Sequence, residues 1–508
     1  MRILVLEVCL AADDADRPHP IYDRLGVHPF INCCGTRTVH GGSLMPTEVV
    51  EAMSQAADRF VNLNELIRAA GRRIAELTGA ESALVTSGAA ASLIAATAGA
   101  MTKGDPERML ALPRADGLPR RVLMPKGARF TYDHAIRTAG AEIVEVADVA
   151  ALEAGLRQGA AMVATIGTKD ADLPIRLEQL AAAARSHGVP VLIDAASEHL
   201  ERPVPYLVRG ASLVAYSGGK YLRGPQSTGL LLGAREWIEA ARLNAAPHHA
   251  IGRPMKISKE EVVGILTAVE HWAAGRDHNS ERARWHDDLG EIARLVAAVP
   301  GVGAELLPPG KAHEQVPRLR IVWDRGMVGL DGLGLREVLL EGRPRIMLDD
   351  RGATECSVFI LPFNLQAGEA SQVGHAIAAA LAAAPARPIP PPKPPAADLS
   401  GRWTIEIDFA AERGRHRLTL HQDGAHLSGE HVTPRLAAPV RGSTAGTSVE
   451  FASLHPFEGS NLSYAFSGTL AGQEMSGTVL LGTSGDSAPG PLNMREFGSA
   501  AWSARRDD

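Results

Sequence analysis

The chain has 508 residues, which is enough for two or three domains, and its formal net charge is −6. An acidic balance of this kind argues against a nucleic-acid partner held by bulk electrostatics. The four cysteines, Cys9, Cys33, Cys34 and Cys356, show no paired metal-ligand spacing, so we expect no metal site and a reducing, cytoplasmic environment. No apolar run is long enough to span a membrane.

The first 20 residues precede any recognisable element pattern. Met1 to Leu10 is apolar but is interrupted by Glu7, and it is too short and too poorly flanked for a convincing signal peptide. We therefore expect residues 1–20 to form a loosely ordered leader.

From residue 21 to residue 245, short apolar strands alternate with helical segments. The expected strands are 121–124, 143–146, 162–166, 189–194, 213–216 and 228–232. The expected helices are 47–59, 66–78, 89–101, 133–139 and 177–187. This alternation predicts an α/β domain with a mostly parallel sheet and helices on both faces. Residues 246–384, which open with a long helix from Lys259, are predicted to form a smaller α/β domain.

Within the larger domain, small residues lead into an Ala-rich helix. The segment is Ala83-Leu-Val-Thr-Ser-Gly-Ala-Ala-Ala91, with Ser87, Gly88 and Ala89 at the expected helix start. Free backbone N–H groups at a helix N-terminus, a serine hydroxyl and a glycine make an anion site that suits a phosphate. The alternative is an ordinary serine N-cap.

A second signal is the apolar strand that ends in Asp194, followed by Ala196 and Ser197. Ligands of open parallel sheets bind at the carboxyl ends of the strands. An aspartate there can pair with a protonated pyridine nitrogen, the small Ala196 leaves room for a flat ring, and Ser197 could reach the phenolic oxygen of that ring. A helix-capping aspartate or a structural ion pair is the alternative.

The third signal is Lys220, which follows an apolar strand inside the glycine-rich run Ser217-Gly-Gly-Lys-Tyr-Leu-Arg-Gly-Pro-Gln226. A lysine shielded from water in such a turn is a good Schiff-base former, and pyridoxal 5'-phosphate (PLP) enzymes require one. An ordinary surface lysine in a turn is the alternative. The cup, the aspartate and the lysine occur in one consistent order, each at the end of a predicted element, and together they favour PLP.

Beyond the smaller domain, residues 385–397 are proline-rich and predict a semi-rigid linker, although a ligand for a proline-binding domain is an alternative. Residues 398–508 alternate apolar and polar positions in at least six expected strands, which predicts a small antiparallel β barrel or sandwich. His416, His421, His426 and His431 recur every five residues, a spacing that does not suit one metal site on a strand, so we expect them to face solvent or loops. An assembly or lid role for this domain is a hypothesis.

Several stretches carry a resemblance to a known family. They are Tyr22–Val27, Ile31-Asn32, Gly35–Pro46, Glu76–Glu81, Ser217–Lys220 with Gly224–Gln226, and Gly252–Lys256 with Lys259–Glu261. Over roughly 22–384 the chain resembles the fold-type I PLP enzymes, within them the selenocysteine synthase-like group that includes D-glucosaminate-6-phosphate ammonia-lyase. The β domain lies outside the resemblance.

The resemblance implies roles for individual residues. Lys220 matches the Schiff-base lysine that later moves protons, Asp194 the partner of the pyridine nitrogen, and Ser87, Gly88, Ala89 and Ser217 the phosphate contacts. A residue that stacks on the ring is expected after strand 121–124, and Tyr132 and His134 are both candidates. The substrate candidates are Thr36, Arg37 and Ser43 in the glycine-rich run, Arg253 and Lys256 as an anion clamp, and more weakly Arg345 and Arg351. The run 35–46 is expected to border the active site, with a simple surface loop as the alternative. For Arg253 and Lys256 the alternative is a solvated basic turn.

The reaction that the resemblance favours is α,β-elimination from an amino acid or amino-sugar acid, which gives a 2-oxo acid and ammonia. An aminotransferase or an aldolase-type lyase is the alternative within the same chemistry. A selenium transferase acting on charged tRNA would need a tRNA-binding N-terminal domain and a basic surface. The expected core begins after about 20 residues and the net charge is acidic, which argues against this reading. A non-catalytic scaffold built on the same fold is the alternative of another class. By analogy, the chain is expected to form a homodimer or a larger homo-oligomer.

Overall fold

The computed structural model describes residues 20–310, 315–384, 386, 393–484 and 496–507. The chain divides into two compact units. The first contains the described residues up to Val322, with Leu335–Asp349 and Phe359–Ala382, and the second contains Trp323–Gly334, Asp350–Val358 and the described residues from Ala383 onward. The expected leader, residues 1–20, lies outside the described residues except for Pro20, which begins the short helix α1 (Pro20–Leu25).

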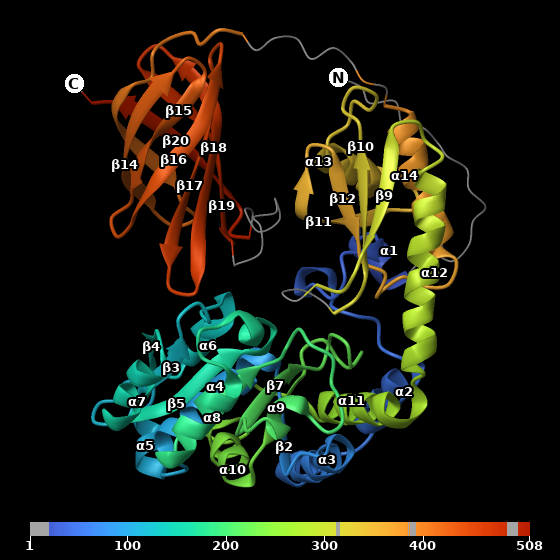
Figure 1. The fold of residues 1–508 in the computed structure, drawn as a ribbon, viewed down its shortest axis with the longest axis vertical. Helices are drawn as coiled ribbons and strands as arrows, with labels where there is room; N and C mark the ends of the chain where they lie inside the picture. Colours follow the sequence, from blue (N-terminus) through green and yellow to red (C-terminus); the bar gives the residue numbers. More distant parts are fainter. Residues whose placement is uncertain (1–19, 311–314, 385, 387–392, 485–495, 508) are drawn as a thin grey trace. The chain divides into compact units, whose positions relative to one another are not determined.

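A seven-stranded sheet forms the centre of the first unit (Figure 1). Its order is β2 (Ser82–Thr86), β8 (Gly229–Gly233), β7 (Leu213–Ser217), β6 (Val191–Asp194), β5 (Ala160–Ile166), β3 (Arg121–Pro125) and β4 (Glu142–Val146). The strands from β7 to β4 pair in parallel, whereas β8 is antiparallel to both of its neighbours. The predicted α/β domain with a mostly parallel sheet is confirmed.

Helices cover this sheet. They are α2 (Thr47–Ala57), α3 (Leu63–Thr78), α4 (Ala89–Thr102), α5 (Pro106–Ala111), α6 (His134–Thr138), α7 (Val149–Arg157), α8 (Leu177–Ser186), α9 (Pro205–Val208), α10 (Arg235–Asn244) and α11 (Lys259–Glu270). Helix α4 is buried along nearly its whole length, and its small residues let it pack closely. At Gly99 an added Cβ would lie 2.7 Å from the backbone nitrogen of Ala241 on α10, so only glycine allows this approach.

A second sheet has the order β1 (Ile31–Cys33), β11 (Ile346–Thr354), β12 (Ser357–Ile360), β10 (Arg318–Trp323) and β9 (Val302–Leu307). The π-helical segment η5 (His271–Gly275) precedes the long α12 (His278–Val296), and α13 (Gly332–Glu341) and α14 (Glu369–Ala382) complete the helices of this region. Strand β1 pairs in parallel with β11, so the N-terminal segment belongs to this sheet rather than to the seven-stranded one.

The C-terminal domain is a closed antiparallel barrel of eight strands joined in sequence order (Figure 1). The strands are β13 (Gly401–Asp408), β14 (Arg413–Asp423), β15 (His426–Val432), β16 (Ala437–Ala445), β17 (Ser448–Phe457), β18 (Ser460–Ala471), β19 (Glu474–Ser484) and β20 (Ser499–Arg506). Of the two predicted architectures, barrel and sandwich, the structure selects the barrel. Closure leaves no unpaired edge strand, and Trp403, Phe451, Phe466 and Trp502 fill part of the interior.

The expectation for the four barrel histidines is wrong at two positions. His421 and His426 are exposed, but His416 is 4% exposed and His431 is fully buried. On these strands inward and outward side chains alternate, and His416, Leu418 and Leu420 share the inward face of β14. His455 on β17 is also fully buried. The barrel therefore encloses three imidazoles.

Acid is expected to destabilise the barrel. Burial lowers the pKa of His416 to about 4 and that of His431 to about 3, whereas an unfolded histidine titrates near about 6.5. Below about pH 6.5 the unfolded chain binds more protons than the folded chain. The contribution of these histidines to the free energy of unfolding is therefore complete above about pH 6.5 and is lost as the pH drops toward 4. Thermal unfolding from pH 7.5 to 5 should show the loss. His431→Gln, which cannot titrate, should have a shallower pH slope than exposed His421→Gln, and equal slopes would contradict the assignment.

Part of the predicted linker packs on the barrel. The backbone N–H of Gly446 donates to the carbonyls of Lys393 and Pro394, at 3.2 Å each, and the N–H of Ala396 donates to Gly446 O at 2.8 Å. Residues 385 and 387–392, which carry most of the prolines, lie outside the described residues.

Candidate active site

Three predicted site segments and the turn after β5 lie at one edge of the seven-stranded sheet. Strands β5, β6 and β7 run in parallel, and β2 has the same direction as β7 because β8 is antiparallel to both. Gly167, Asp194, Ser217 and Ser87 therefore follow or end strands at the same edge. The sheet topology thus brings together the cup, the aspartate and the lysine turn.

The predicted phosphate cup has its first-turn backbone donors uncapped. The N-cap of α4 is Gly88, at φ +86°, and no side chain caps the helix, so the structure does not support the alternative of a serine N-cap. Thr86 Oγ1 donates to Gly88 O at 3.0 Å and contacts Ser92 Oγ at 2.7 Å, which holds the turn from beneath. Ser87 Oγ has no hydrogen bond within the described part of the chain. These groups suit an anion at the N-terminus of a 14-residue helix.

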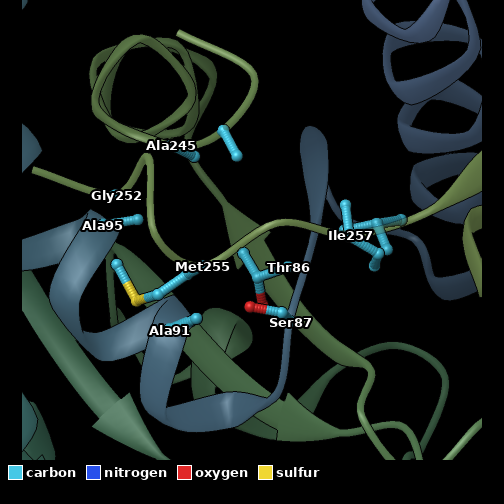
Figure 2. Close-up of a pocket in the computed structure, with 10 residues that line it drawn as sticks. Thr86, Ser87, Ala91, Ala95, Ala245, Gly252, Met255 and Ile257 are labelled. Atoms are coloured by element: carbon cyan, nitrogen blue, oxygen red, sulfur yellow. The ribbon is translucent and has the colours of Figure 1, made fainter. Parts of the chain in front are cut away.

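A small pocket lies beside this turn, and Figure 2 shows its lining. Ser87, Ala91 and Ala95 come from the cup and α4, while Gly252, Met255 and Ile257 come from the segment that contains the predicted anion clamp. Gly252 must be glycine because an added Cβ would lie 2.4 Å from Asn244 O. The segment 245–257 is therefore held against the cup.

Asp194 is 6% exposed at the end of β6. Its Oδ1 accepts a hydrogen bond of 2.8 Å from the backbone N–H of Ala196. Burial raises the pKa of Asp194, while that hydrogen bond and the positive charge of Lys220 act in the opposite direction. The carboxyl group thus lies within the electrostatic reach of Lys220 and would be stabilised as an anion by a further cationic partner.

The turn that carries Lys220 is held by the glycine-rich run near the N-terminus. Ser43 Oγ donates to Gly219 O at 3.0 Å and contacts Lys220 O at 3.2 Å. At Gly42 an added Cβ would lie 2.9 Å from Gly219 O, and Gln226 Nε2 donates to Thr38 O at 2.8 Å. The run 35–46 therefore borders the lysine turn within one chain.

Asn364 is a residue that the sequence analysis missed. It is 6% exposed, and its Nδ2 donates to Gly35 O at 2.8 Å and to Gly42 O at 3.0 Å, which ties both ends of the glycine-rich loop together. Because Asn364 lies more than 300 positions along the chain from this loop, no local pattern marks it.

Two ionisable pairs near this edge were also missed. Glu198 Oε2 accepts a 2.7 Å hydrogen bond from Tyr206, and burial raises the pKa of Glu198 to about 7. His199 stacks on Tyr221 with ring centroids 3.9 Å apart, and burial lowers its pKa to about 4. The signal available from sequence was the Glu-His pair that directly follows Ser197.

The remaining candidates are distributed as follows. Tyr132 and His134 are both exposed after β3, at the carboxyl edge of the sheet, and either one still stands as the predicted stacking residue. Ala196 and Ser197 are half-buried beside Asp194. Arg253 is half-buried and Lys256 is exposed, and neither side chain has an ion pair among the described residues.

Four further candidates lie in the N-terminal run or at β11. Thr36 is buried, and Arg37 donates to Asp349 Oδ1 at 2.7 Å. Arg345 donates to the backbone carbonyls of Leu340 and His28, so its guanidinium ties the N-terminal segment to β11. Arg351 lies on β11 in the second unit.

Asn364→Asp is expected to loosen the loop without changing side-chain size. A carboxylate cannot donate to Gly35 O and Gly42 O, so two bonds are lost and like partial charges meet, at a cost of roughly 1–3 kcal/mol. We expect a lower melting temperature and a kcat lower by roughly tenfold or more, because the loop supports the Lys220 turn. Exposed Asn279→Asp is the control. Unchanged kcat in Asn364→Asp would contradict the link from loop to lysine.

The fold and this edge together define a PLP enzyme of fold type I. A solved structure of D-glucosaminate-6-phosphate ammonia-lyase superposes with a TM-score of 0.64 at 28% identity, over 72% of this chain and 99% of that one. The D-glucosaminate-6-phosphate ammonia lyase of Salmonella typhimurium is 30% identical over 333 residues, which are 63% of this chain and 87% of that protein. The chain belongs to this family and is a PLP-dependent enzyme.

Other relatives show the breadth of the family. The 5'-C-glycyluridine monooxygenase-decarboxylase of a Streptomyces species is 32% identical over 345 residues, which are 65% of this chain and 84% of that protein. An L-seryl-tRNA(Sec) selenium transferase from Proteus mirabilis is 25% identical over 274 residues, which are 48% of this chain and 56% of that protein. No protein-family model matches the chain.

The residues at the sheet edge fit PLP. Ser87 and the uncapped N–H groups of the first turn of α4, which begins at Ala89, suit its phosphate, the buried Asp194 suits its ring nitrogen, and Lys220 suits its aldehyde. Binding of PLP would also explain why the carboxyl group of Asp194 is buried at a strand end, since a protonated ring nitrogen would offset the cost of its desolvation.

Proposed function

We propose that the protein is a PLP-dependent ammonia-lyase that acts on a β-hydroxy amino acid or amino-sugar acid. The net reaction removes the α-hydrogen and the β-hydroxyl group as water, and hydrolysis of the C–N bond then gives a 2-oxo acid and ammonia. The observation that carries the proposal is the similarity to D-glucosaminate-6-phosphate ammonia lyase across 87% of that relative. The intact Lys220, Asp194 and phosphate cup support it.

Bound PLP supplies an electron sink for the charge that develops at the α-carbon. The chain supplies the groups around it. Lys220 Nζ removes the α-proton and then protonates the departing β-hydroxyl group, which needs one side chain that can act as base and acid. Ser43 fixes the main chain of the turn through Gly219 O and Lys220 O, so that the amine returns to one position. Asp194 keeps the proton on the ring nitrogen.

Arg253 and Lys256 are proposed to bind an anionic group of the substrate. Both lack an ion-pair partner among the described residues, and their segment lies against the cup. Arginine pairs well with carboxylate or phosphate oxygens. Arg37 is a less direct candidate because its guanidinium already pairs with Asp349.

A second candidate function follows from the relative that is 32% identical, a monooxygenase-decarboxylase. The cofactor-binding residues would serve either reaction, since PLP stabilises charge after loss of a proton or of carbon dioxide. Aminotransfer and retro-aldol cleavage use the same residues. The reaction products separate these possibilities.

The test is a product assay on the PLP-loaded protein with serine, threonine and C2-amino-sugar acids, with and without a terminal phosphate. The lyase proposal predicts equal amounts of ammonia and 2-oxo acid, independent of oxygen. Carbon dioxide release with oxygen consumption would favour the second candidate. Conversion of PLP to its amine form by an amino donor would favour an aminotransferase. If the PLP-bound protein turned over none of these substrates, the result would favour the alternative of a non-catalytic scaffold.

We also propose that the chain acts as a homo-oligomer in the cytoplasm. Within the described segment 39–61, Val39, Leu44, Phe60 and Val61 are 75%, 62%, 102% and 54% exposed, and exposed apolar side chains favour contact with another copy. Cys33, Cys34 and Cys356 form no disulfide within the described part of the chain, which suits a reducing compartment. No helix in the described part of the chain is long and apolar enough to cross a membrane.

A further inference from the structure

The interior of the C-terminal barrel contains a polar layer that the enzyme chemistry does not use. His416 comes from β14, His431 from β15, Ser453 and His455 from β17, and Tyr464 from β18. Each of the five is at most 7% exposed. Most other buried side chains of the barrel are apolar, with Thr444 and Ser463 as polar exceptions, and at the opposite end Trp403 Nε1 donates to Leu399 O. Burying three imidazoles is costly compared with an apolar filling, so the layer calls for a functional explanation.

The three histidines and Ser453 form a continuous hydrogen-bonded chain. His416 Nδ1 lies 2.9 Å from His431 Nε2, and His431 Nδ1 lies 2.7 Å from Ser453 Oγ. Ser453 Oγ and His431 Nδ1 each lie 3.1 Å from His455 Nε2. His416 retains 4% exposure, whereas His431 and His455 have none, so the chain leads from the barrel surface to its interior.

The chain ends at a buried atom without a partner. Within the described part of the protein, His455 Nδ1 makes no hydrogen bond. When all three rings are neutral, donors can point from His416 toward His455 or in the reverse direction. The first arrangement leaves an N–H at Nδ1 and the second leaves a lone pair there, so the atom lacks a partner either way.

An added proton removes this ambiguity. A chain that carries one excess proton must have an N–H at both ends, so His455 Nδ1 then becomes a donor that needs an acceptor. An anionic acceptor would also balance the added charge, which a buried site requires. The ionisable groups that face the layer are the three histidines and Tyr464. Strands β13, β16, β19 and β20 present no ionisable side chain that is buried in the interior.

We propose that this end of the barrel binds a small carboxylate together with one proton, with a carboxylate oxygen accepting a hydrogen bond from Nδ1–H of His455. The proton enters at His416, and the chain distributes its charge over the three rings. Burial lowers the pKa of all three histidines, so the site is uncharged at neutral pH until the anion binds. The described residues contain no group of three His, Cys, Asp or Glu side chains that could hold a metal, since the ring nitrogens are directed at one another.

This inference does not depend on the proposed lyase activity. The test is calorimetric titration of the full-length protein with acetate, in two buffers of different ionisation enthalpy, and with acetamide as a neutral isostere. We expect acetate to bind with uptake of about one proton, with an affinity that rises by up to about tenfold per unit fall in pH between 7.5 and 5.5. Equal binding of acetamide, binding without proton uptake, or no binding would each overturn the proposal; no binding would mean that Nδ1 meets only a buried water.

Variants locate the site. His455→Phe should lose the proton-coupled binding, whereas His426→Gln, an exposed histidine on β15, should retain it. Retention in His455→Phe would place acetate elsewhere, for example at the PLP edge. Since His455→Phe could perturb the barrel, the ¹⁵N shifts of the histidine rings in the unaltered protein give a second test. Acetate should fix a proton on Nδ1 of His455, and unchanged shifts would contradict the proposal.

Discussion

Lys220→Ala is expected to abolish turnover and to remove the visible absorbance of the protein-bound cofactor. The lysine is the residue proposed to hold the PLP aldehyde and to act as base and acid at the substrate. General acid–base catalysis alone is worth a factor on the order of 10²–10⁴, and the covalent attachment is lost as well. We therefore expect kcat to fall by at least about 10³-fold. Steady-state assays and absorbance spectra of both proteins, purified with PLP, provide the measurement.

The matched control is Lys126→Ala, since Lys126 is an exposed lysine that follows β3. It should keep both the spectrum and kcat. Substantial turnover in Lys220→Ala would show that Lys220 is an ordinary turn lysine. Loss of the spectrum together with loss of folded protein would instead indicate a structural role, so the melting temperature is measured beside both.

The cup, Asp194 and the Lys220 turn, which make up the PLP edge of the seven-stranded sheet, could be predicted from sequence because each is marked by a local pattern of residues. Asp194 and Lys220 each follow a short apolar run, and Gly88 directly precedes an Ala-rich helix, so strand end, turn and helix start are visible within about ten residues. The missed elements have weaker local patterns. Strand β2 (Ser82–Thr86) is a short segment before the cup, and α7 and α10 lie in stretches where apolar and charged residues mix.

The features that escaped prediction depend on contacts between distant positions. Asn364 donates hydrogen bonds to Gly35 O and Gly42 O, which lie far from it in the sequence. In the sequence itself it is only an asparagine in a loop, which does not indicate this role. In the barrel, a spacing of five residues between histidines gave no indication that His416 and His431 share an interior. They lie on paired strands whose register sets Leu418 opposite His431. Strand register is a property of the folded pair, which local periodicity does not determine.

Asp194→Asn should have opposite effects on the empty protein and on the PLP-bound protein. Burial raises the pKa of Asp194, so its charged form is disfavoured in the folded protein without a cationic partner. By linkage, a raised carboxyl pKa contributes stability at low pH that is lost as the pH rises through the folded pKa. Asparagine keeps an oxygen for the Ala196 N–H and carries no charge. The cofactor-free variant should therefore be at least as stable as wild type at neutral pH.

With PLP bound, we expect the Asp194→Asn variant to be less stable than the wild-type protein. Asparagine cannot pair with a protonated ring nitrogen, and loss of one partner of a buried charge pair costs about 3–5 kcal/mol. We expect weaker PLP binding and a kcat lower by roughly 10²–10³-fold, whereas melting without PLP stays equal or rises. Melting curves with and without PLP, beside kcat, measure both signs in one variant. A loss of stability without PLP would mean that the carboxylate pairs with a group of the protein itself, and the buried charge at the end of β6 would then be structural rather than reserved for the cofactor.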